Sequence, residues 1–161
     1  MLQKIISTIF LLFSISVVCQ NTSDSIETED NSISAQFYTK CFENLNQGAE
    51  ILEKYAAFKN IKFCSILACS YLLSYEEEIQ FVGEKRLVGI ATQLFREGNP
   101  VHMIMGMDSS LYANEKNENL TDDNHLVYIS YGECTNPSFL IKGAEIVNKQ
   151  TKLLIEQSRS K

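Results

Sequence analysis

The sequence lacks every pattern from which a catalytic activity could be assigned. It holds two histidines, and none of its serines lies in a nucleophile-elbow pattern. Its seven glycines are dispersed and form no phosphate-binding loop, and its acidic residues do not follow the EF-hand spacing. The sequence therefore predicts no catalytic residue, no cofactor and no metal ligand.

Positive charge is also scarce. The chain has 14 Lys and Arg against 20 Asp and Glu, for a net charge of −6, and its longest basic cluster is Lys85-Arg86. Nucleic acids and anionic membranes attract basic proteins, so we expect neither as a partner. Beyond residue 19 no apolar run approaches the about 20 residues that span a bilayer, so no membrane span is expected.

The first 19 residues have the layout of a cleavable secretory leader. Lys4 precedes the apolar run 5–18, and polar residues follow Cys19. A membrane anchor is the alternative, but the run is short and contains several hydroxyl residues. A bacterial lipid-modified Cys19 is a second alternative. We predict a signal peptide over 1–19, and hence a secreted, extracellular protein (periplasmic or lipid-anchored in a bacterium).

Four cysteines remain after the leader: Cys41, Cys64, Cys69 and Cys134. An even number of cysteines in an oxidising compartment favours two disulfides over free thiols or a zinc site. Cys64 and Cys69 lie five positions apart in a predicted helix, which separates them too far to pair with each other. We therefore expect Cys41 and Cys134 each to pair with one of them.

Two sequons predict N-glycosylation in a eukaryotic host, at Asn21 and at Asn119. Asn119 is the stronger of the two, because it falls in a polar, charged stretch predicted to be a loop.

The composition predicts one domain between two tails. Residues 20–34 are polar and acidic and are expected to form a flexible segment. Residues 35–158 are expected to form a single globular α+β domain, and 159–161 a frayed tail. Apolar residues at steps of three and four predict a helix over 35–58, capped by Ser34 and kinked or split at 46–48.

The rest of the pattern predicts a second helix over 61–80, with Glu76-Glu77-Glu78 at its C-terminal end. Strands are predicted over 86–95 and 101–107, joined as a hairpin by the turn 96–100. A helix over 85–96 is the alternative for the first strand. A polar loop over 108–124, a strand over 125–134 and a helix from 135 to about 157 complete the chain.

The predicted fold class is thus α+β, with three helices packed on a small three-stranded antiparallel meander in the order α-α-β-β-β-α. Met103, Met105 and Met107 would share one strand face. Thioethers there could bind Cu(I), but we expect them to fill the core. His102 and Asp108 would share the other face, about 20 Å apart along the strand.

These features predict a secreted, soluble, non-enzymatic protein that binds a protein partner or a small apolar ligand. Two alternatives stay open: a secreted or lysosomal hydrolase-like enzyme, and a protease-inhibitor-like module that presents the turn at Gly98-Asn99-Pro100. An apolar cavity between helices and sheet would favour a carrier. A histidine in a cleft beside a carboxylate or hydroxyl would favour an enzyme.

The predicted disulfides are tested by the intact mass of the secreted chain with and without reductant. We expect reduction to add about four hydrogens, two for each bridge. An unchanged mass would show that the four cysteines carry no bridge.

Overall fold

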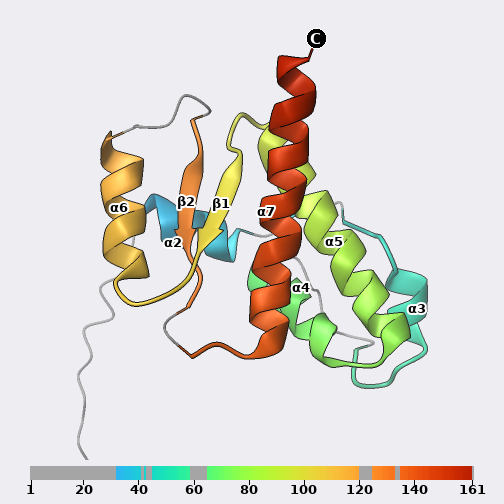
Figure 1. Ribbon diagram of the computed structural model, residues 1–161. Helices are drawn as coiled ribbons and strands as arrows, with labels where there is room; N and C mark the ends of the chain where they lie inside the picture. Colours follow the sequence, from blue (N-terminus) through green and yellow to red (C-terminus); the bar gives the residue numbers. More distant parts are fainter. Residues whose placement is uncertain are drawn as a thin grey trace, which may run out of the picture. The chain divides into compact units, whose positions relative to one another are not determined.

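Two short parallel strands and six α-helices make up the part of the chain that the structure describes (Figure 1). This computed structural model describes residues 32–40, 42, 45–58, 65–119, 125–132 and 135–160, which all belong to the packed unit Asn31–Lys161. The elements in chain order are α2 (Ile33–Thr39), α3 (Ala49–Glu53), α4 (Ile66–Tyr71), the 3₁₀ turn η1 (Leu72–Ser74), α5 (Glu77–Arg96), β1 (Val101–Ile104), α6 (Ser109–Asn119), β2 (Val127–Ser130) and α7 (Ser138–Arg159).

The predicted three-stranded antiparallel meander is wrong. The described residues contain one sheet of two strands, and β1 and β2 run parallel. The element order also differs, because the predicted strand over 86–95 lies within α5 and the predicted loop over 108–124 contains α6. The predicted signal peptide over 1–19 lies outside the described residues.

Helix α5 explains the first of these errors. Its buried positions, which include Leu87, Ile90, Ala91 and Leu94, recur at steps of three and four, and that spacing is helical whatever the β-propensity of the residues. The acidic run at 76–78 opens this helix instead of closing the preceding one. Acidic side chains are stabilising at the N-terminus of a helix, which is the positive end of its dipole, so the run stabilises the start of α5.

The predicted first helix is divided into α2 and α3, with the predicted break near Gly48 confirmed. Gly48 adopts a left-handed backbone conformation, with φ of 77°, and is the N-cap of α3. The cap of α2 is Ser32, whose hydroxyl accepts a hydrogen bond from the backbone of Ala35. Ser34 was the predicted cap, but its side chain instead accepts a hydrogen bond from the backbone N–H of Ser130 on β2, at 2.9 Å.

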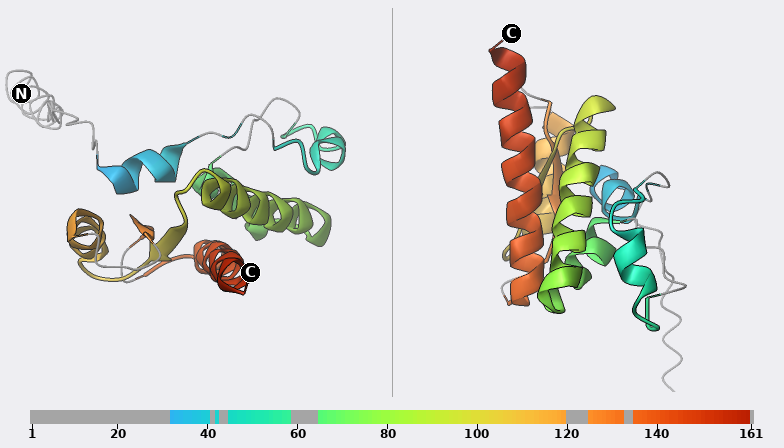
Figure 2. Two further views of the ribbon diagram at one scale, coloured as in Figure 1. Left: turned by 90° about the horizontal axis from the view of Figure 1, so that it is seen from above. Right: turned by 90° about the vertical axis from the view of Figure 1, so that its right-hand side faces the viewer.

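The strands belong to a β-α-β unit in which α6 forms the crossover. Val101 pairs with Val127, and Ile104 pairs with Ser130. Parallel strands need a crossover of a dozen residues or more, which a hairpin turn cannot provide. Figures 1 and 2 show α6 beside β2, α7 beside β1, and α2 with α5 on one side of the sheet.

The outer edges of both strands are closed by asparagine side chains. Asn148 of α7 accepts from the backbone N–H of Met103 at 2.7 Å and donates to the Met103 carbonyl at 2.9 Å. Asn117 of α6 makes the same pair of bonds with Tyr128 on β2, at 2.8 and 2.9 Å. Each side-chain amide thus takes the place of a neighbouring strand, and leaves these backbone groups satisfied.

Helices α4, α5 and α7 pack closely around the core because glycine, which has no side chain, occupies two of their contact positions. A Cβ on Gly83 of α5 would lie 2.9 Å from the carbonyl oxygen of Cys69 on α4, and a Cβ on Gly143 of α7 would overlap the hydroxyl of Ser70. That hydroxyl accepts a 2.5 Å hydrogen bond from Tyr131 and donates to the Ile66 carbonyl. Burial raises the pKa of the Tyr131 hydroxyl above its ordinary value.

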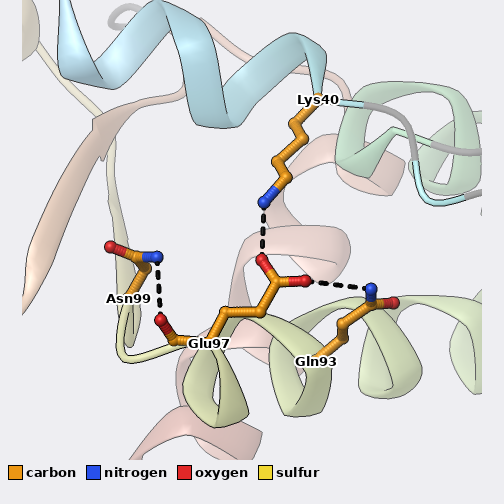
Figure 3. A network of polar contacts seen from close by, with 4 residues as sticks. All are labelled: Lys40, Gln93, Glu97 and Asn99. Atoms are coloured by element: carbon orange, nitrogen blue, oxygen red, sulfur yellow. Dashed lines mark hydrogen bonds and ion pairs between the residues drawn. The ribbon is translucent and has the colours of Figure 1, made fainter.

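A surface network joins the end of α2 to the end of α5 (Figure 3). Lys40 pairs with the Glu97 carboxylate at 2.5 Å, and Gln93 donates to the other carboxylate oxygen at 3.0 Å. The Lys40 ammonium, and then the Gln93 amide, lower the pKa of Glu97. Such exposed pairs contribute about 0–1 kcal/mol each, so the network adds little to the stability of the fold.

We predict that Asn148→Ala and Asn117→Ala each lower the free energy of unfolding by about 2 kcal/mol. Each change removes two hydrogen bonds from backbone groups at a strand edge. Urea denaturation followed by circular dichroism measures the loss.

The matched control is Asn114→Ala, an exposed asparagine of the same helix as Asn117. Its effect should stay within about 0.5 kcal/mol. If all three variants were equally stable, the asparagines would not be closing the sheet.

Candidate functional site

Helix α7 extends past the start of the sheet. It runs antiparallel to the strands (Figure 1), and its Asn148 is fixed opposite Met103 of β1. From Met103 back to Val101 the strand covers only about 7 Å, whereas α7 continues from Asn148 to Arg159, about 16 Å further along its axis. The last turns of α7 therefore have no strand beside them.

A half-open pocket of about 480 Å³ lies at this overhang. Its lining residues come from β1, from the residue before β2 and from the second half of α7: His102, Leu126, Asn148, Lys149, Thr151, Lys152, Ile155, Glu156 and Arg159.

The seven α7 residues of the lining form two stripes at helical spacing. Asn148, Thr151 and Ile155 form the inner stripe and are buried or half-buried, while the outer stripe is exposed to solvent. We call this outer stripe the rim; it consists of Lys149, Lys152, Glu156 and Arg159. The pocket thus has an inner wall of low charge and a charged rim.

Thr151 is the unusual member of the inner stripe. It is 2 % exposed, and its hydroxyl is the one buried side-chain oxygen or nitrogen without a hydrogen-bond partner among the described residues. A helical threonine commonly bonds the carbonyl one turn earlier, but this one does not. A buried hydroxyl without a partner costs about 1–3 kcal/mol of folding free energy.

His102 reaches the pocket from β1. As predicted, it lies on the opposite strand face from the buried Met103. Its ring packs in a T-shaped arrangement with that of Tyr128, with the centroids 5.7 Å apart, and Tyr128 in turn contacts Tyr112 at 6.3 Å. His125, the other histidine, is exposed and is not part of the pocket lining.

A second hollow lies at the opposite end of the strands, beside the start of α6. Its lining includes Gly106, Asp108, Ser109, Ser130 and Gly132. The Ser109 hydroxyl already bonds the hydroxyl of Ser130 at 2.7 Å and the carbonyl of Gly132 at 3.2 Å. Its buried polar group is therefore satisfied within the protein, unlike Thr151 in the α7 pocket.

The predicted disulfide cysteines are represented in the described residues by Cys69 alone. Cys41, Cys64 and Cys134 lie outside the described residues, so the predicted pairing stays a prediction. Cys69 is a buried thiol of α4. Burial raises its pKa to about 12, although the neighbouring Arg86 guanidinium acts in the opposite direction. A thiol held in its protonated form is a poor nucleophile.

The predicted glycosylation site Asn119 is the last residue of α6 and not part of a loop. Its side chain is exposed and donates to the Glu115 carbonyl at 2.8 Å. Asn21 lies outside the described residues, and glycosylation at either position stays a prediction.

The three alternating methionines do not share one face. Met103 is 3 % exposed in the core, but β1 ends at Ile104, and Met107 is 79 % exposed. Across the described ranges, no group of three or more His, Cys, Asp and Glu side chains is placed to hold a metal ion.

No protein-family model matches the chain, and no curated protein or solved structure matches it. In the described part of the chain, none of the helices is both long and apolar enough to cross a membrane.

Sequence patterns place His102 on the strand face opposite Met103, but they predict no site residue there or on α7. One indication of the α7 residues exists in the sequence. Thr151 stands four residues after Val147, in the stripe that is otherwise apolar and buried. A hydroxyl at a core position indicates either an internal hydrogen bond or a polar contact with something else.

We predict that Thr151→Val raises the free energy of unfolding by about 1 kcal/mol, because it replaces an unsatisfied hydroxyl with a methyl group of similar size. The control is Thr92→Val on α5, since the Thr92 hydroxyl donates to the Val88 carbonyl and accepts from Gln150.

The control should lose about 1 kcal/mol. Urea denaturation of both variants gives the comparison, and a destabilising Thr151→Val would mean that this hydroxyl has a partner within the folded chain.

Proposed function

We propose that this protein binds a small, largely apolar ligand in the pocket between α7 and the start of the sheet. The observation that carries the proposal is the inner wall of that pocket, where the apolar side chains of Leu126 and Ile155 are among the lining residues. The volume of about 480 Å³ also falls in the range of small-molecule sites.

The inner surface of the pocket suits an apolar body. Leu126 lines it from the residue before β2, and Ile155 lines it from α7. The lysine side chains beside them add methylene stems, which cover apolar surface while the ammonium groups stay in water. A ligand that covers this surface is stabilised by about 25 cal/mol for each Å² of apolar area removed from water.

Binding is supported better than catalysis. The pocket does contain a histidine, a hydroxyl and a carboxylate, which is the combination that would favour an enzyme. Among the described residues, however, the Thr151 hydroxyl has no hydrogen-bond partner, so His102 does not contact it as a general base. Glu156 lies on the exposed rim, where it pairs with Lys152 at 3.9 Å.

The protease-inhibitor alternative depended on a hairpin turn at residues 98–100, and these residues do not form one. Gly98, Asn99 and Pro100 instead connect α5 to β1. Gly98 ends α5 in a left-handed conformation, with φ of 80°, and Pro100 is buried. The proposal keeps the predicted leader, so the binding protein would act outside the cell.

We predict that the full chain binds one molecule of N-phenyl-1-naphthylamine, a neutral probe that fluoresces in apolar surroundings. Ile155→Trp should weaken this binding at least about tenfold, because the larger side chain fills the pocket. Fluorescence titration measures the affinity, and circular dichroism checks that the variant is folded.

The matched control is Leu153→Trp. Leu153 is on the same helix but is exposed and outside the pocket lining, so this variant should bind like the wild type. No binding, or equal binding by the two variants and the wild type, would contradict the proposed site.

A further inference from the structure

The rim of the pocket has a charge opposite to that of the chain. Of its four charged side chains, Lys149, Lys152 and Arg159 are cationic and Glu156 alone is acidic. The whole chain has a net charge of −6. The rim is therefore a local positive region on an acidic protein, at the mouth of its candidate binding site.

Lys149 is the rim cation most available to a ligand. Lys152 is one turn away from Glu156 and forms an ion pair with it at 3.9 Å. Lys149 has no ion pair with any side chain that the structure describes. It is exposed and next to the inner stripe of the same helix, so its ammonium can meet a headgroup at the mouth of the pocket.

We infer that the ligand of this pocket is a small amphiphile with an anionic headgroup, which rests on the function proposed above. Its apolar body would lie against Leu126 and Ile155, and its headgroup would lie at the rim beside Lys149. This orientation leaves the charged group partly hydrated, so it avoids the cost of burying an ion. The reverse orientation would place the charge against the apolar wall.

The inference is tested with octanoate and 1-octanol, which share one apolar chain and differ in headgroup charge. Each is used to displace N-phenyl-1-naphthylamine from the full chain. At low ionic strength octanoate should bind about tenfold more tightly than 1-octanol, because a carboxylate attracts the excess positive charge of the rim. The difference should shrink at high salt, which screens exposed charges.

Lys149→Met separates the charge of this lysine from its apolar stem. The variant should bind octanoate about threefold more weakly, and it should bind 1-octanol unchanged because the methylene surface remains. The matched control is Lys85→Met on α5, a lysine outside the pocket lining, which should leave both affinities unchanged.

The two proposals fail in different ways. Equal displacement by octanoate and 1-octanol, or displacement by 1-octanol alone, would overturn the anionic ligand and leave the apolar binding site in place. A probe that binds Ile155→Trp as well as it binds the wild type would overturn the site itself. An effect of Lys85→Met as large as that of Lys149→Met would also overturn the inference, because the charge effect would not be local.

Discussion

The hydrogen bonds between asparagine side chains and strand edges are the interaction on which the rest of this structure depends. A sheet of two parallel strands has two open edges and cannot stand alone in water. Asn148 and Asn117 supply to each edge the donor and acceptor that a third strand would bring. This holds α7 beside β1 and α6 beside β2, while α2 and α5 cover the buried face of the sheet (Figure 2).

The pocket is a consequence of that arrangement. Once Asn148 is fixed against Met103, the length of α7 carries its last turns beyond the first residue of the strand. The inner side of those turns keeps the spacing of a buried stripe, but the sheet no longer covers it. Ile155 is therefore left facing a hollow, and the exposed residues next to it become its rim. The alignment of Asn148 with Met103 thus stabilises the fold and also creates the candidate site.

The parts of the fold that local patterns determine were predicted well. The last helix, the strand positions near 101 and 127, and the break at Gly48 follow from caps, spacing and turn residues. Over 86–95 the residue types favour a strand, but the helical spacing of the buried Leu87, Ile90 and Leu94 decides the structure. The polar α6 cannot be told from a loop by its pattern, because it buries only Ser109 and Ala113 and shows almost no apolar stripe. A long connection between two strands is itself typical of a parallel crossover.

The sequence by itself determined the acidic character of the chain, the start of α7 near Pro137 and the placing of His102 on the opposite strand face from Met103. Tertiary structure decided that the strands are parallel and that α7 meets β1 at Asn148. It also decided that Thr151 lies in a pocket wall. The reason is physical: caps and periodicity act between residues a few positions apart. Which segment covers a strand edge, and where the overlap of α7 with β1 ends, depend instead on segments far apart in the chain. Only packing brings those segments together.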